Sequence, residues 1–191
     1  MKSWYGVLAG LVLAGGLSGC SFNNERKDID LVEASYSAVD SIHDQLNGRV
    51  DMSRPVIVTS FVNVDDLTQS SSLGRIIGEQ FASRMSQLGY RVIEMKLRDT
   101  VFIQEKNGEF MLSRKLRDIS AEHQADGIVV GTYAVGKDHA YVTARVVQAV
   151  DSTLVAGHDY AIPLGPDAQS MLKQRKHRSS SAAGGGLSAA Y

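Results

Sequence analysis

Residues 55–62 read Pro55-Val56-Ile57-Val58-Thr59-Ser60-Phe61-Val62, and this stretch decides the fold. Its β-branched and aromatic side chains do not alternate with polar ones, which is typical of a strand that is covered on both faces. A polar connection follows at 63–70, and a helix is predicted after it. The apolar residues of this helix recur every three or four positions: Leu73, Ile76, Ile77, Phe81, Met85 and Leu88.

Gly89 ends that helix, and residues 90–97 are predicted to form a second strand. A helix between two strands favours a parallel pair joined by a crossover. Upstream, apolar residues at helical spacing predict a helix over 30–46, which Gly48 terminates. The first half of the domain therefore reads as helix, strand, helix, strand.

The second half begins with a predicted hairpin, because Asn107-Gly108 suits a tight turn between strands at 100–104 and 110–113. A helix is expected next, ending near Gly127. Three strand-like runs follow, at 128–135, 140–150 and 154–162, and their short polar turns predict an antiparallel meander. We therefore expect an α/β (α+β) fold, a single mixed-sheet domain over 30–165 with helices packed on the sheet.

The amino-terminal residues 1–19 are predicted to be a signal peptide, because Lys2 precedes an apolar run that is too short for a permanent membrane helix. The run ends in Leu17-Ser18-Gly19-Cys20, which looks like the lipobox of bacterial lipoproteins. Such a match implies that Cys20 carries the acyl lipid, which in these proteins usually includes palmitate, and that residues 20–29 are a lipidated tether. The alternative is an ordinary secreted protein with a cysteine near its cleavage site.

Ser21 follows the cysteine, whereas an aspartate at that place commonly signals retention in the inner membrane. We therefore expect a lipid anchor in the outer membrane, with the domain on the periplasmic face. Residues 166–191 are predicted to be a disordered basic tail rich in Gly, Ser and Ala, with a net charge of +3, while residues 20–165 carry −5. The tail either touches an anionic surface or is simply solvated.

The composition excludes several classes of protein. A net charge of −1 over 191 residues does not fit a strongly basic nucleic-acid binder, and one cysteine does not fit a disulfide scaffold. A zinc site at His139 and His158 has a weak pattern, and a hydrolase loop at Asp65, Asp66 and 70–72 lacks a nucleophile elbow. We therefore predict no catalytic residue, no metal and no cofactor, and expect that the protein is not an enzyme.

Three stretches together are similar to the FlgO domain of bacterial outer-membrane lipoproteins: Pro55 to Leu67, Ser70 to Arg75 leading to Gly89-Tyr90-Arg91-Val92, and Val130 to Gly136. The resemblance implies a fold like the amino-terminal domain of TolB and a role in flagellar motility, with basal-body ring proteins such as FlgP and FlgT as partners. It brings no catalytic residue. The motif residues that define either the fold or a contact surface are Asn63, Asp65, Asp66, Gly74, Arg75 and Tyr133.

The sequence therefore predicts an outer-membrane lipoprotein that supports motility as a structural or stabilising component of the flagellar basal body, acting by protein binding and with self-association open. The alternative is an envelope lipoprotein that regulates peptidoglycan synthesis or export. A hydrolase or metal enzyme is the third reading.

Overall fold

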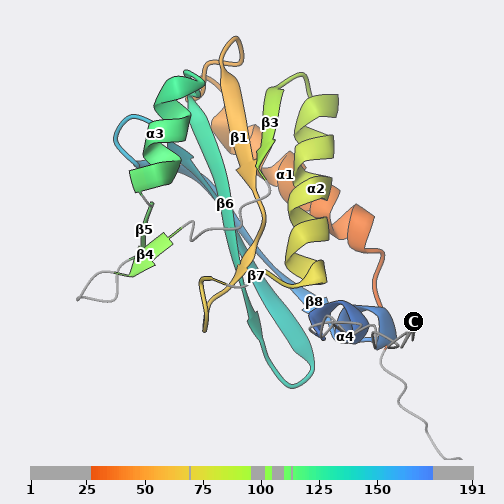
Figure 1. The fold of residues 1–191 in the computed structure, drawn as a ribbon. Helices are drawn as coiled ribbons and strands as arrows, with labels where there is room; N and C mark the ends of the chain where they lie inside the picture. The colour runs from red at the N-terminus through yellow and green to blue at the C-terminus, as the bar shows by residue number, and fades with distance from the viewer. Residues whose placement is uncertain (1–26, 69, 96–101, 105–109, 113, 174–191) are drawn as a thin grey trace, which may run out of the picture.

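The computed structural model describes residues 27–68, 70–95, 102–104, 110–112 and 114–173. They form a mixed sheet with α1 (Leu31–Leu46) and α2 (Ser72–Gln87) on one face, α3 (Arg114–Glu122) on part of the other face, and α4 (Pro166–Leu172) at one end (Figure 1). The predicted α+β class and mixed sheet are confirmed.

The main sheet has the strand order β3-β1-β6-β7-β8, with β2 pairing the far half of β6. Its strands are β1 (Pro55–Thr59), β2 (Val62–Asn63), β3 (Arg91–Met95), β6 (Gly127–Val135), β7 (His139–Gln148) and β8 (Leu154–Pro163). β1 runs parallel to β3 and β6, as the crossover through α2 requires. β6, β7 and β8 form the predicted antiparallel meander.

The two long helices begin at side-chain caps. Asp30 accepts hydrogen bonds from the backbone N–H groups of Val32 and Glu33 at the start of α1. Ser71 accepts one from Gly74 N at the start of α2. These bonds satisfy N–H groups that have no partner inside the helix, which is why each helix begins there.

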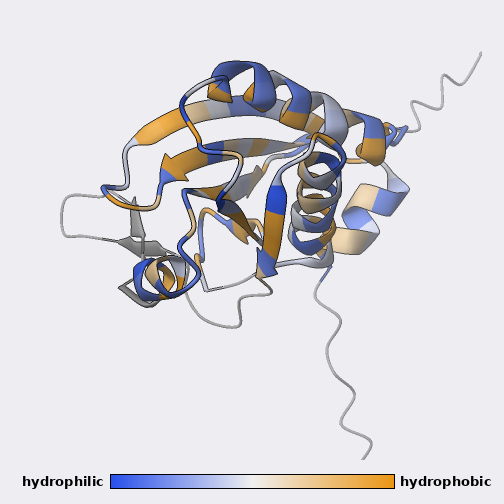
Figure 2. Cartoon of the chain, turned by 90° about the horizontal axis from the view of Figure 1, so that it is seen from above, coloured by the Kyte–Doolittle hydropathy of each residue, from blue (hydrophilic) through white to orange (hydrophobic). Residues whose placement is uncertain are grey.

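Most of the core lies between the sheet and the face that α1 and α2 cover. Phe61 and Phe81 meet there with ring centroids 5.0 Å apart, and both side chains are fully buried. A smaller cluster around Ile57, Leu116 and Ile128 lies under α3. Figure 2 shows hydrophobic residues along the strands, while hydrophobic and hydrophilic residues alternate along the helices.

Three details correct the sequence interpretation. The strand expected over 55–62 is divided into β1 and β2, because Phe61 N leaves the ladder and donates to Gly74 O at 3.0 Å. The predicted hairpin exists as β4 (Phe102–Gln104) paired antiparallel with β5 (Phe110–Leu112), but this pair is a separate sheet. Its turn lies outside the described residues.

The third correction concerns the tail. Residues 166–172 were expected to belong to a disordered segment, yet they form α4, whose Ala168 is buried and whose Met171 and Leu172 pack against the core. Pro166 at the first turn and buried Leu164 just before it explain this helix. Asp28, assigned to the tether, also belongs to the fold because it caps α4. Residues 174–191, like Cys20 and the predicted signal peptide, lie outside the described residues.

Candidate functional site

The six motif residues come together around the connection between β2 and α2. Asn63 ends β2 and pairs with Tyr133 of β6, while Gly74 and Arg75 lie in the first turn of α2. Asp65 and Asp66 lie in the connection itself. The sequence motif therefore marks one place in the fold, at the carboxyl-terminal edge of parallel strands, where α/β sheets often bind ligands.

Hydrogen bonds within this connection use much of its polar capacity. Asn63 Oδ1 accepts from Asp65 N at 2.9 Å, and Val64 N donates to Tyr133 O at 3.0 Å. Asp66 Oδ1 accepts from both the N–H and the hydroxyl of Thr68, at 3.0 and 2.6 Å. These side chains therefore hold the turns of the loop, as Asx turns do.

Gly74 and Tyr133 fix the loop against the sheet. A methyl group at Gly74 would overlap the Phe61 carbonyl oxygen and approach the Tyr133 ring to 2.9 Å, so only glycine fits. The Tyr133 hydroxyl accepts a hydrogen bond from Ser71 N at 3.1 Å, at the cap of α2. Both residues are thus fold determinants whose requirement comes from close packing.

Asp65 and Arg75 are the exposed members of the motif. Arg75 donates to Ser70 O at 2.8 Å and to Ser72 Oγ at 3.0 Å, so its guanidinium is held against the start of α2. A charged side chain that is already ordered loses little entropy when a partner binds. The motif therefore offers a preorganised polar surface at the rim of the fold.

The chemistry considered from the sequence is not assembled at this place. Asp66 serves Thr68, and neither motif carboxylate has a histidine or cysteine partner among the described contacts. His139 and His158 project from opposite faces of the sheet, because His158 pairs with Ala144 on the buried face whereas His139 has the other parity. Within the described residues no group of three His, Cys, Asp or Glu side chains is placed to hold a metal ion.

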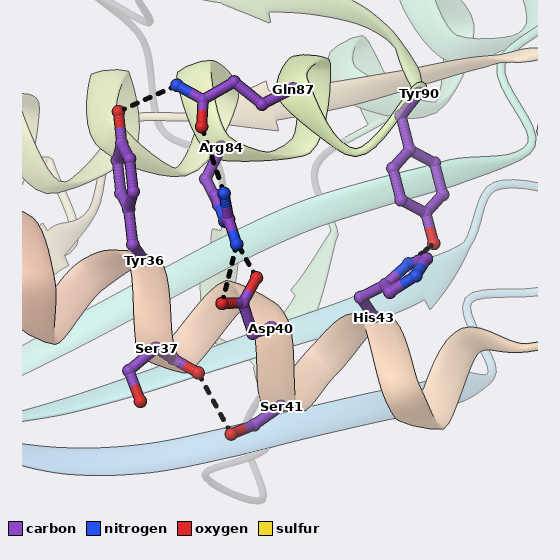
Figure 3. Close-up of polar contacts among 8 residues, drawn as sticks. All are labelled: Tyr36, Ser37, Asp40, Ser41, His43, Arg84, Gln87 and Tyr90. Atoms are coloured by element: carbon purple, nitrogen blue, oxygen red, sulfur yellow. Dashed lines mark hydrogen bonds and ion pairs between the residues drawn. The ribbon is translucent and has the colours of Figure 1, made fainter.

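Sequence reasoning missed a polar cluster that joins α1 to α2 (Figure 3). Arg84 forms a bidentate ion pair with Asp40, with N···O distances of 2.8 and 2.9 Å, and its guanidinium carbon lies 5.5 Å from the centroid of the Tyr36 ring. The hydrogen bond to Asp40 raises the pKa of Arg84. Gln87 completes the cluster by bonding both Arg84 and the Tyr36 hydroxyl.

The same pair of helices is joined further along by His43 and Tyr90. His43 Nδ1 lies 2.9 Å from the Tyr90 hydroxyl, and the two rings meet edge to face. Burial raises the pKa of Tyr90, which keeps the hydroxyl protonated at neutral pH. Tyr36, Asp40 and His43 share one helix face at spacings of four and three, which was the available signal, but the partner residues on α2 depend on how the helices cross.

A cavity of about 380 Å³ lies at the opposite end of the domain, between α3 and the turn from β7 to β8. Its lining includes Arg54, Arg117, Ser120 and Val150. Arg54 is fully engaged with the protein, since it pairs with Asp126 at 2.8 Å and donates to the carbonyl oxygens of Gln124 and Ala125. The cavity is therefore an open surface hollow with one immobilised arginine.

Fold and site define the class of protein: a single-domain α+β module whose motif residues shape an ordered polar rim. The FlgO protein family matches residues 36–167, which is most of the chain, so the chain belongs to the FlgO family. The match spans α1 to the start of α4 and includes all six motif residues. The family resemblance that the sequence motif implied is thereby confirmed.

Solved structures with a related shape come from several envelope proteins. The C-terminal domain of LpoB from Salmonella enterica aligns with a TM-score of 0.49 and 8% identity, covering 66% of this chain and 96% of that one. LpoB of E. coli gives 0.48 and 7% over 85% and 81%, and the PelC dodecamer of Paraburkholderia phytofirmans 0.40 and 13% over 58% and 71%. Among curated proteins no match is found.

Proposed function

We propose that this FlgO-family protein is a lipid-anchored component of the outer membrane that supports flagellar motility by binding other proteins of the basal body. The observation that carries the proposal is the family match, which covers residues 36–167 of a domain described from Lys27 to Lys173. The part of the chain that folds is thus almost entirely the part that the family defines.

The proposed anchor is the lipid on Cys20. No helix in the described part of the chain is long and apolar enough to cross a membrane. Cys20 follows an apolar run in a Leu-Ser-Gly-Cys context, and two or three acyl chains together hold a protein stably at a bilayer. Because Ser21 rather than aspartate follows Cys20, the proposed location is the periplasmic face of the outer membrane.

The proposed mode of action is assembly rather than catalysis. Asp65 and Arg75 at the motif rim, together with the Tyr36, Asp40 and Arg84 cluster, present ordered charged and aromatic groups of the kinds that dominate protein interfaces. FlgP-like and FlgT-like ring proteins, or a second copy of the chain, are the proposed partners. No cofactor is part of the proposal.

Complementation of a deletion strain tests this function. The wild-type chain should restore swimming, whereas Cys20→Ser should leave the membrane fraction and fail to restore it. Ser21→Asp is the matched variant, since it keeps the acylated cysteine but should move the protein to the inner membrane. We expect Ser21→Asp to be membrane-bound and still unable to support swimming.

The same strains separate the proposal from its rival. Loss of swimming with normal growth and normal resistance to wall-active antibiotics is the expected phenotype of the deletion. Normal swimming combined with antibiotic sensitivity would contradict the flagellar role and favour regulation of the cell wall. Normal membrane fractionation of Cys20→Ser would contradict the anchor alone.

A further inference from the structure

The chain enters and leaves the domain at the same end. Asp28, the second described residue, accepts hydrogen bonds through its two carboxylate oxygens from Asp167 N at 2.9 Å and Ala168 N at 3.0 Å. The turn between β6 and β7 meets the same place, because Leu164 N donates to Asp138 O at 2.9 Å. We call residues 27–32, 135–141 and 164–173 the anchor end; Figure 1 shows α4 and the start of α1 there.

α4 is held firmly at the anchor end. Leu164 and Ala168 are buried, Met171 and Leu172 pack against the main core, and Gln169 Nε2 donates to Leu164 O at 2.8 Å. Gly165 lies so close to Asp28 that a methyl group there would overlap it. Lys173, where the described chain ends, is therefore fixed on the side of the domain where Lys27 begins.

The anchor end also exposes apolar and aromatic surface. Ile29, Val32, Val135 and Tyr141 are 38%, 46%, 45% and 59% exposed, and they account for four of the seven large hydrophobic residues exposed in the described chain. Tyrosine with neighbouring aliphatic side chains is typical of protein surfaces at the membrane interface. This surface is independent of any charge in the tail.

The tether limits how far the anchor end can lie from a membrane. Eight residues separate Cys20 from Asp28, so a fully extended tether spans at most about 28 Å. This step rests on the proposed acylation of Cys20. Arg175, Lys176 and Arg178 follow Lys173 within five residues, a reach of at most about 18 Å. The lipid surface and these cations are thus confined to the same narrow space.

We propose that the anchor end faces the membrane and that Arg175, Lys176 and Arg178 bind anionic phospholipid headgroups. Residues 174–191 carry three positive charges and no negative one, whereas residues 20–165 carry −5. The folded domain alone would be repelled by an anionic surface. The tail supplies the attraction, and its proximity to the tether raises the effective concentration of headgroups.

Nearby carboxylates compete weakly for these cations. Asp28 and Asp30 are turned into the first turns of α4 and α1, where backbone N–H groups and the helix dipoles already compensate their charge. Lys137 and Asp138 on the turn between β6 and β7 also have interaction partners within the described chain. The headgroups of the bilayer are therefore the uncompensated anions nearest to the tail.

Energy transfer in proteoliposomes tests the proposal with the full acylated chain. In a Ser179→Cys variant the acylated Cys20 thiol is blocked, so residue 179 is the single labelling site for a donor, and a headgroup-labelled lipid is the acceptor. Vesicles contain phosphatidylcholine alone or with about one third phosphatidylglycerol. A Val150→Cys label at the opposite end of the domain reports its orientation. Arg175→Gln/Lys176→Gln/Arg178→Gln removes the charge, and Arg175→Lys/Arg178→Lys is the charge-preserving control.

We expect strong transfer from residue 179 only in the anionic vesicles, weaker transfer from residue 150, and loss of the anionic response at high salt or in the glutamine variant. In the soluble Cys20→Ser background each basic residue should contribute about fivefold to vesicle binding. Equal transfer from residue 179 in both vesicle types, or a glutamine variant that behaves like the charge-preserving control, would overturn the proposal. Failure of the chain to float with vesicles would contradict the anchor as well, whereas floating with an unresponsive tail would contradict the tail contact alone.

Discussion

Gly74 lies where the first turn of α2 crosses the backbone of Phe61. Its N–H is capped by Ser71 and its carbonyl oxygen accepts from Phe61 N, so neither strand nor helix can move away without breaking a hydrogen bond. We expect Gly74→Ala to lower the free energy of unfolding by about 3 kcal/mol, since the methyl group would overlap the Phe61 carbonyl oxygen.

Urea denaturation measures this loss, and Gly157→Ala is the matched control. The nearest atom to a methyl group at Gly157 is Ala144 O at 3.5 Å, an ordinary contact, so its stability should change by about 0.5 kcal/mol at most. A Gly74→Ala midpoint as close to wild type as that of Gly157→Ala would show that the loop tolerates the crossing being widened.

Tyr160 gives the stability a dependence on alkaline pH. Its hydroxyl is buried without a hydrogen-bond partner in the described chain, and burial raises its pKa to about 12 from the usual 10.0. The folded protein therefore keeps the proton where the unfolded chain loses it. Stability is fully present below pH 10 and falls as the pH rises towards 12, by about 2.7 kcal/mol over two pH units.

Tyr160→Phe removes this ionisation and an unsatisfied hydroxyl. We expect the variant to be as stable as wild type at pH 7, or more stable by about 1 kcal/mol, and to lose less stability between pH 10 and 12. Burial also raises the pKa of Tyr90, so some alkaline loss should remain. Urea midpoints at pH 7, 10 and 11.5 measure the effect, and identical pH profiles of variant and wild type would refute it.

At the scale of elements, periodicity predicted α1, α2, α3 and the three meander strands, because each buries one continuous apolar face. It could not place β4 and β5 outside the main sheet, since alternation within a strand does not identify its neighbour. α4 was missed because its composition is polar and its stability comes from contacts with Asp28 and the core, which are distant in sequence.

The Asp28 cap is the element-scale contact that we expect to be separable. Asp28→Ala should cost about 1 kcal/mol and should speed amide exchange at Asp167 and Ala168, whose N–H groups it leaves without an acceptor. Asp30→Ala is the control, because it removes the equivalent cap from α1 and leaves α4 untouched. Unchanged exchange at Ala168 in Asp28→Ala would mean that core packing alone holds α4.

At the scale of the molecule, the motif residues were located by sequence, but their division into roles was not. Gly74 and Tyr133 are required by packing, while Asp65 and Arg75 remain exposed for contact, and this difference depends on which side chains the loop itself consumes. The α1–α2 cluster stayed hidden for the same reason. Its Arg84 and Asp40 are 44 residues apart, and only the crossing of the helices brings them together.

The central claim is that this FlgO-family domain is a membrane-tethered part of the flagellar basal body. Quantitative mass spectrometry of intact basal bodies, purified from wild-type and Cys20→Ser cells, tests it most directly, with an unrelated outer-membrane lipoprotein as the measure of carry-over. We predict that the wild-type chain is enriched together with the ring proteins and well above carry-over, and that Cys20→Ser is depleted. A wild-type chain that is abundant in the membrane fraction but no more enriched in basal bodies than the control lipoprotein would contradict the claim.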